Sequence, residues 1–324
     1  MKKVAVIFTG GTISMTVDSR LKAAIPSMSS EDIMSMVTNI DKIADLELID
    51  FGKYPGPHMT PRLMMELKQL VEKMLEREDI DGIVVTHGTD NLEETAFLLD
   101  LTTEHIKPVI VVGAMRNGSE LGYDGPSNLA AAICTAISPE SVGRGVLVVL
   151  NDEINAAREV TKSHTMALDT FKSLEFGPIG IVDQQHVIFY RKGLHETPLI
   201  KTNHIEEDVY LIKAVSGMDS KIINFLISED VKGIVIEAMG RGNVPPGLMP
   251  GIRKASQHSI PVVIVSRCPM GRVMGSYGYE GGGASLEKAG AILASTLNGQ
   301  KARIQLMLAL AHSKDISKIR KLFV

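Results

Sequence analysis

Short apolar runs alternate with segments of helical periodicity along the first half of the chain. The runs are rich in valine and isoleucine, as buried strands are, whereas the segments between them carry apolar residues at every third or fourth position. Strands separated by helices of this length are typical of βαβ units in a parallel sheet. The predicted strands are Val4–Phe8, Gly82–Thr86, Pro108–Val112 and Gly145–Leu150.

Two of the helices between these strands have clear N-terminal signals. Thr60 is a favourable N-cap, and Pro61 suits the first helical position. Asp90 and Glu93 have the spacing of a capping box, in which each side chain bonds to the other residue's backbone N–H. The predicted helices run from Thr60 to Leu75, from Asp90 to about Leu101 and from Asp124 to about Ile137.

The regular alternation stops over residues 151–207 and resumes at Asp208. A chain of 324 residues also exceeds the usual limit of one hydrophobic core, which favours two domains. We predict an α/β fold whose larger N-terminal domain, residues 1–190, has a mostly parallel sheet with flanking helices. A connector, residues 191–207, leads to a smaller C-terminal α/β domain, residues 208–324.

The composition is that of a globular protein without a strongly charged surface. Hydrophobic residues make up 44% of the chain, and the formal net charge of −4 provides no field to attract nucleic acid or an anionic membrane. No apolar run approaches the ~18 residues of a membrane span, and the N-terminal run is too short for a signal peptide. We therefore expect a cytoplasmic protein with no nucleic-acid or membrane partner. Cys134 and Cys268 lie in apolar surroundings and are expected to be buried thiols.

Two loops carry hydroxyl residues directly after predicted strands. One is Thr9–Ser14 (TGGTIS) and the other is Thr86–Asp90 (THGTD). Ligands bind at the carboxyl edge of a parallel sheet, so the two loops suggest hydroxyl chemistry shared between neighbouring strands. The glycines also suit a phosphate loop, although the spacing fits neither common nucleotide motif. A tight turn with a hydroxyl cap explains the first loop equally well.

A threonine hydroxyl is inert as a nucleophile unless a base lies nearby. Lys162 is a candidate, because an ammonium group packed against Asp90 would relay a proton from Thr89 or from a water that Thr89 holds. Each residue also has a structural explanation: Asp90 suits an N-cap, Lys162 a solvated position, and His87 a hydrogen-bonded structural histidine. The sequence contains no cluster with metal-ligand spacing, so neither a metal nor a cofactor is expected.

Four segments of the chain form a pattern when they are taken together. They are TGGTI, DGIVVTHGTDNLEETAFLLDL, VVGAMRNGSELGYDGPSNL and VTKSHTMALDTFKS, in this order. In this order and spacing they resemble the bacterial-type L-asparaginases, which hydrolyse asparagine and in some members glutamine. Asn298–Arg303 resembles the family's closing motif, so the resemblance extends over nearly the whole chain. It implies an amidohydrolase that acts on a small amino-acid amide and forms a homotetramer or a dimer.

The resemblance implies roles for the residues that match the family's motifs. Thr12 matches the nucleophile that attacks the side-chain amide carbonyl. Thr89, Lys162 and Asp90 match the second hydroxyl and its proton relay, and Asp90 would also bind the substrate's α-amino group. Asn243 matches an asparagine that a neighbouring subunit supplies. An acyl-enzyme would form, ammonia would leave, and water would release the acid.

Two parts of the family pattern are altered. The family carries a tyrosine in the loop after TGGTI, but residues 13–31 contain no aromatic residue. The family's Ser-Gln substrate-binding pair falls near residues 52–59, where this chain has Lys53–His58 (KYPGPH), so Tyr54 or His58 would have to replace it. A protonated imidazole in this stiff segment would suit the substrate's α-carboxylate. The candidate substrate-binding residues are Gly11, His58, Asp90, Asn243 and Glu280.

The catalytic pattern is therefore intact, whereas the substrate-binding pattern is altered. The simplest interpretation is an L-asparaginase. One alternative keeps the mechanism but acts on glutamine or another amino-acid amide. A second alternative is a non-catalytic amino-acid-binding protein, although binding alone would need neither two hydroxyls nor a buried lysine.

Overall fold

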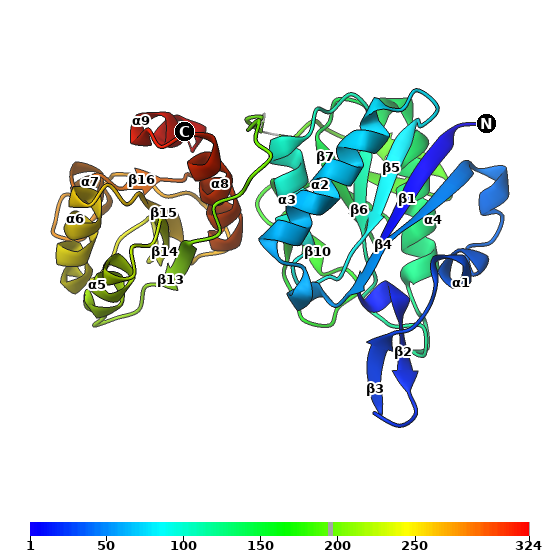
Figure 1. Cartoon of the computed structure of the whole chain (residues 1–324), viewed down its shortest axis with the longest axis horizontal. Helices are drawn as coiled ribbons and strands as arrows, with labels where there is room; N and C mark the ends of the chain where they lie inside the picture. The colour runs from blue at the N-terminus through cyan, green and yellow to red at the C-terminus, as the bar shows by residue number, and fades with distance from the viewer. Residues whose placement is uncertain (194–196, 324) are drawn as a thin grey trace. The chain divides into compact units, whose positions relative to one another are not determined.

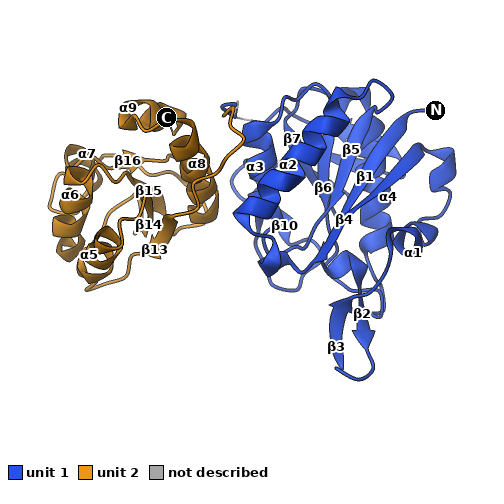
Figure 2. Cartoon of the chain, in the orientation of Figure 1, with its two compact units in different colours: residues 1–199 blue, residues 200–324 orange. Residues whose placement is uncertain are grey.

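The computed structural model describes residues 1–193 and 197–323. The chain divides into two compact units, residues 1–199 and residues 200–324 (Figure 2). Each unit is an α/β structure with its own sheet, so the predicted fold class is confirmed. The finer assignment of residues 191–207 as a connector stays a prediction.

The first unit has an eight-stranded sheet in the order β12-β11-β8-β7-β6-β5-β1-β4. The five strands from β7 to β4 are parallel, whereas β8, β11 and β12 join the sheet as antiparallel neighbours. The sheet is therefore mostly parallel, as predicted. Its strands are β1 (Lys3–Gly10), β4 (Asp45–Tyr54), β5 (Gly82–Thr86), β6 (Val109–Val112), β7 (Val146–Leu150), β8 (Glu153–Ala156), β11 (Gly180–Asp183) and β12 (His186–Phe189).

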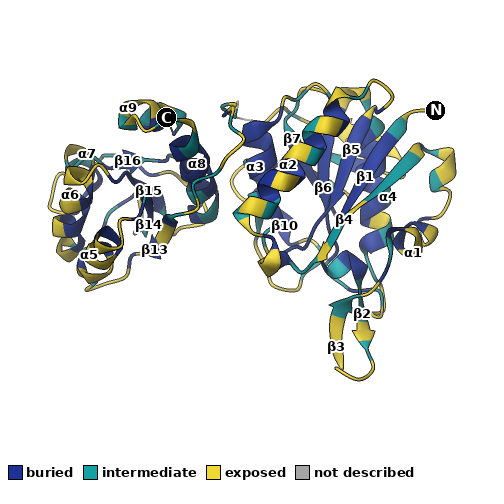
Figure 3. Cartoon of the chain, in the orientation of Figure 1, coloured by how far each residue is buried: buried dark blue, intermediate teal, exposed yellow. Residues whose placement is uncertain are grey.

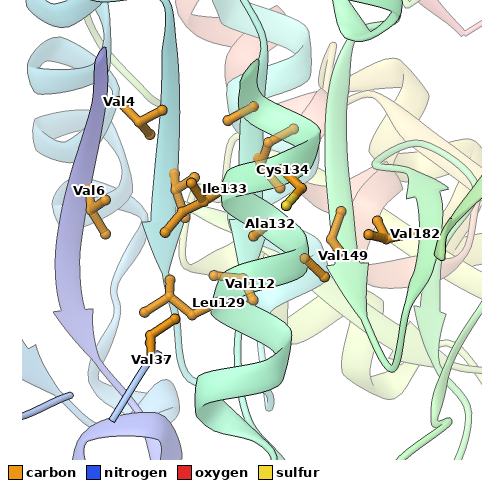
Figure 4. Packing of buried hydrophobic residues seen from close by; sticks show 14 of the residues in the cluster. Val4, Val6, Val37, Val112, Leu129, Ala132, Ile133, Cys134, Val149 and Val182 are labelled. Carbon is orange, nitrogen blue, oxygen red and sulfur yellow. The ribbon is translucent and has the colours of Figure 1, made fainter. Parts of the chain in front are cut away.

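Helices cover both faces of this sheet, because its central strands are apolar on both sides. Along β1, Val4 and Val6 pack beneath α4, whereas Ala5 and Ile7 pack beneath α2 and α3 (Figure 1). Figure 4 shows the α4 side, where Leu129 and other α4 residues meet the strands. The helices are α1 (Ser30–Ser35), α2 (Pro61–Glu76), α3 (Leu92–Thr102) and α4 (Gly125–Ile137).

Two small hairpins complete the first unit. The strands β2 (Met15–Asp18) and β3 (Ala23–Pro26) form a hairpin that projects from the body of the unit, and its tip is exposed (Figure 3). The strands β9 (Thr161–Lys162) and β10 (Phe171–Lys172) form the second. Short 3-10 turns lie at Thr12–Ser14, Ile40–Lys42, Gly56–His58 and Pro139–Ser141.

The second unit has a parallel four-stranded sheet in the order β13-β14-β15-β16. Isoleucines of β14 and β15 pack against α5, α6 and α7, and α8 lies on the other face (Figure 1). The strands are β13 (Val209–Lys213), β14 (Gly233–Ala238), β15 (Val262–Ser266) and β16 (Ile292–Leu293). The helices are α5 (Lys221–Ser228), α6 (Met249–Gln257), α7 (Gly283–Lys288), α8 (Gly299–His312) and α9 (Ile316–Leu322), with a 3-10 turn at Pro246–Leu248.

The structure confirms the predicted cap at Thr60, whose side chain accepts a hydrogen bond from the Leu63 N–H. The capping box predicted at Asp90 is wrong. The helix α3 begins only at Leu92, and its N-cap residue, Asn91, makes no side-chain capping bond. The Asp90 carboxylate instead accepts a hydrogen bond from a lysine of β9, which is a stronger donor than a backbone N–H.

One of the two cysteine predictions is also wrong. Cys134 is buried on α4, but Cys268 is exposed, because β15 and its apolar run end at Ser266 and the chain then enters a surface loop. Both thiols are free. Among the described residues, no helix has both the length and the apolar character that crossing a membrane requires.

Candidate active site

The loops that follow β1, β4 and β5 touch one another backbone to backbone at the carboxyl edge of the first unit's sheet. A Cβ atom added to Gly11 would lie 2.4 Å from the Cα and N atoms of Gly88. A Cβ atom added to Gly88 would lie 2.7 Å from the Cα and N atoms of Gly56. Only glycine permits these approaches, and Gly11 also has a φ of 82°. Since Thr12 and Thr89 each follow a glycine of this contact, the two predicted hydroxyls belong to adjoining loops.

Thr12 begins a 3-10 turn whose backbone is held on both sides. The Gly11 N–H donates to the Tyr54 carbonyl at 3.0 Å, which ties the turn to the end of β4. The Ser14 N–H and hydroxyl both donate to the Gly11 carbonyl, at 3.0 and 2.9 Å. Thr12 is half-buried, so its side chain remains partly open to a ligand.

Lys162 connects the second hydroxyl to a carboxylate. Its ammonium group donates to Thr89 Oγ1 at 3.0 Å and to Asp90 Oδ1 at 2.9 Å. The side chain of Lys162 is 17% exposed, whereas that of Asp90 is 61% exposed. The structure therefore brings together Thr89, Asp90 and Lys162, three of the predicted catalytic residues. The Asp90 carboxylate binds Lys162 and is also open to solvent.

Glu93 is a residue of this site that the sequence interpretation assigned only to a cap. Its buried carboxylate accepts hydrogen bonds from Thr161 Oγ1 at 2.9 Å and from the Lys162 N–H at 3.3 Å. These bonds fix the backbone of β9, from which the Lys162 side chain extends toward Thr89. The sequence signal for Glu93 was its spacing from Asp90, which a capping box explains equally well.

The buried His87 side chain holds the loop that follows β5, and both of its ring nitrogens are hydrogen-bonded. Its Nδ1–H donates to the Gly88 carbonyl at 2.8 Å, so the neutral ring accepts at Nε2 from Thr95 Oγ1, also at 2.8 Å. Complete burial lowers the pKa of His87 to about 4. A neutral imidazole that is hydrogen-bonded at both ring nitrogens matches the structural role predicted for His87.

The segment that replaces the family's Ser-Gln pair forms the turn Gly56–His58. His58 is exposed, and within the described part of the chain its side chain makes no hydrogen bond, so it is available to a ligand. Tyr54 turns back over Gly52 and lies beside Phe51, with ring centroids 6.1 Å apart. Of the two candidates, His58 is the more exposed residue.

The remaining predicted residues, Asn243 and Glu280, lie in the second unit. Asn243 Oδ1 accepts a hydrogen bond from the Gly283 N–H at 3.3 Å, which joins the loop after β14 to the start of α7. Glu280 is exposed and forms an ion pair with Arg253 at 2.8 Å, and this hydrogen bond lowers the pKa of its carboxyl group. The predicted residues thus form two sets, one in each unit.

Two family models together match nearly the whole chain. A family model described as "Asparaginase, N-terminal" matches residues 3–194, and one described as "Glutaminase/Asparaginase C-terminal domain" matches residues 208–323. The chain belongs to the asparaginase family. The resemblance seen in the sequence motifs is confirmed.

Individual members of the asparaginase family match over almost their full length. An L-asparaginase of Bacillus licheniformis is 36% identical, covering 97% of this chain and 97% of its own. A probable periplasmic L-asparaginase of Haemophilus influenzae is 33% identical, covering 100% of this chain and 93% of its own. The crystal structure of a probable cytoplasmic L-asparaginase from Campylobacter jejuni superposes with a TM-score of 0.89 at 31% identity, covering 100% of this chain and 99% of that one.

Proposed function

We propose that this member of the asparaginase family hydrolyses the side-chain amide of L-asparagine to L-aspartate and ammonia, with Thr12 as the nucleophile. Its L-asparaginase relatives support the reaction. The observation that carries the mechanism is the Lys162 ammonium group, which bridges Thr89 and Asp90 in a loop that adjoins the Thr12 turn.

In the first half of the reaction, Thr12 Oγ attacks the amide carbon and forms an ester. The carbon–nitrogen bond breaks, and the proton of the Thr12 hydroxyl leaves with ammonia. Backbone N–H groups of the loop that contains Gly11 stabilise the oxyanion. In the second half, a water held by Thr89 attacks the ester carbon and Thr12 recovers a proton from that water. Thr89, Lys162 and Asp90 relay the protons.

Substrate binding uses groups from both sets of residues. The exposed carboxylate of Asp90 binds the α-amino group, and His58 binds the α-carboxylate. Asn243 completes the site from a neighbouring subunit in a homotetramer or dimer, and Glu280 of the second unit is a further substrate-binding candidate. We also propose a cytoplasmic location, supported by the Campylobacter jejuni neighbour, although the Haemophilus influenzae relative is a probable periplasmic enzyme.

A panel of amides tests this function. Ammonia release is measured for asparagine, glutamine and other amino-acid amides, with the wild type and with His58→Ala. We expect asparagine to have the highest kcat/KM with the wild type. We expect His58→Ala to raise KM more than it lowers kcat. Turnover of glutamine alone would favour the second candidate, which the altered Lys53–His58 segment makes worth testing. No turnover of any amide would refute hydrolysis.

A further inference from the structure

We propose that Tyr123 is a positioning residue for the nucleophile, because its hydroxyl fixes the turn that carries Thr12. Tyr123 lies between β6 and α4, 110 residues along the chain from Ile13, yet its hydroxyl donates a hydrogen bond to the Ile13 carbonyl. Ile13 follows Thr12 directly, so a shift of this carbonyl moves Thr12. The inference rests on the proposed role of Thr12, and Tyr123 acts through the backbone of Ile13.

A glycine makes room for the tyrosine ring. A Cβ atom added to Gly125 would lie 2.4 Å from Cζ and from the hydroxyl oxygen of Tyr123, so the ring crosses the first turn of α4 where no side chain stands. The ring also packs against the buried cluster that contains Ile13. Burial raises the pKa of the Tyr123 phenol, which keeps the hydroxyl protonated and able to donate.

The next residue along the chain fixes the start of the loop that follows β6. The Asp124 carboxylate accepts hydrogen bonds from the backbone N–H groups of Met115 at 3.0 Å and of Arg116 at 2.8 Å. Tyr123 and Asp124 therefore fasten the loops that follow β1 and β6. In the sheet these two strands flank β5, whose loop carries Thr89.

The hairpin that follows Thr12 is fastened to the same region. The Gly118 N–H donates to the Met15 carbonyl at 2.9 Å, and the Val17 N–H donates to Ser119 Oγ at 2.9 Å. The loop before α4 thus supports β2 along its length, and the Tyr123 contact is the one nearest to the nucleophile in sequence. Its hydroxyl is a side-chain donor that reaches the nucleophile turn from a distant segment.

Tyr123→Phe tests the role of the hydroxyl, because it keeps the ring and its packing. We expect kcat for asparagine to fall about three- to tenfold, the range for the loss of one neutral hydrogen bond. KM should stay within about twofold, because the substrate-binding groups are unchanged. In the absence of substrate, amide hydrogen exchange at Ser14 and Met15 should become faster. Tyr190→Phe is the matched control, since Tyr190 is 60% exposed.

Gly125→Ala breaks the same contact without removing the hydroxyl, since the added Cβ would displace the ring. It should lower kcat by a similar factor. The double variant Tyr123→Phe/Gly125→Ala should lose no more than either single variant, because both remove one interaction.

An unchanged kcat in Tyr123→Phe would overturn the inference, as would losses that multiply in the double variant. A lower melting temperature with an unchanged kcat would also overturn it, leaving Tyr123 a packing residue. Thr12→Ala is assayed in parallel to separate the two proposals. Normal turnover by Thr12→Ala refutes the proposed function, whereas an inactive Thr12→Ala beside a normal Tyr123→Phe refutes only the role of Tyr123.

Discussion

Lys162 donates to Thr89 and to Asp90 through one ammonium group, and the proposed proton relay depends on it. Lys162→Met keeps most of the length of the side chain but removes the charge and both hydrogen bonds. We expect turnover to fall at least about a hundredfold, as for the loss of one acid–base group. The free energy of unfolding should change by less than about 1 kcal/mol, because water solvates the carboxylate of Asp90, which is 61% exposed, in the variant. Ammonia release and thermal melting measure the two effects.

Lys172→Met is the matched control for this variant. Lys172 lies on the neighbouring strand β10 and forms an ion pair with Glu153 at 2.8 Å. It should retain its activity while losing a comparable ion pair. If Lys162→Met retained as much activity as Lys172→Met, Lys162 would be a surface charge with no part in the proton relay.

His87 is expected to make the protein acid-sensitive. Its pKa of about 4 lies below the ordinary value of 6.5, so the unfolded chain binds a proton in this window while the folded chain does not. Stability is therefore complete above about pH 6.5 and falls as the pH decreases toward 4, by at most about 3 kcal/mol from this residue. Melting temperatures across this range should fall less steeply in His87→Gln. An equal slope in His87→Gln, with exposed His186→Gln as control, would contradict this account.

The sequence suggested Lys162 as a partner of Asp90 and Thr89, whereas the bonds that Glu93 makes to β9 were not predicted. Asp90 and Glu93 have capping spacing, yet both carboxylates bind groups of β9 instead. Capping spacing is a local signal, so it could not show that the carboxylates instead face β9, whose Lys162 lies 72 residues after Asp90. Cys268 shows the same limit, because its burial depends on where β15 ends rather than on nearby apolar residues.

At the scale of elements, three loops at the carboxyl edge of the sheet adjoin through Gly11, Gly56 and Gly88. Gly88→Ala would place a Cβ atom 2.7 Å from the Gly56 backbone, so the loops after β4 and β5 must separate. Because a displacement of about 1 Å can cost a hundredfold in rate, we expect kcat/KM to fall at least about tenfold. Gly193→Ala is the control, since its Cβ would meet atoms no closer than 3.9 Å. Equal activity in both variants would show that this contact does not position the site.

The elements themselves were predictable because their signals are local. The strands β1, β5, β6 and β7 are continuous apolar runs that are buried on both faces, and Thr60 caps α2 as its sequence indicates. The contacts between loops were not predictable in the same way. The hydrogen bond from Tyr123 to Ile13 joins the loops that follow β6 and β1, and only the order of strands in the sheet brings these loops together.

At the scale of the whole molecule, the candidate residues are divided between two units, with Thr12 in one and Asn243 in the other. If a neighbouring subunit supplies Asn243, two inactive variants should complement each other. Thr12→Ala and Asn243→Ala are unfolded together and refolded as mixed oligomers. Random pairing makes about half of the pairs mixed, and one of the two sites in each mixed pair is intact, so about a quarter of the wild-type activity should return. Separately refolded variants are the control. No recovery in assemblies shown to be mixed would place Asn243 and Thr12 of one chain in the same site.

In the proposed mechanism, Thr12 forms a covalent ester with the substrate's acyl group. Wild-type enzyme that is turning over asparagine is quenched with acid at the shortest time that a rapid mixer allows. The protein is then digested and analysed by peptide mass spectrometry. We expect an aspartyl ester on the peptide that contains Thr12, and we expect neither an ester nor ammonia release from Thr12→Ala. An ester on Thr89 instead, or a Thr12→Ala variant that turns over asparagine at a rate close to wild type, would contradict this mechanism.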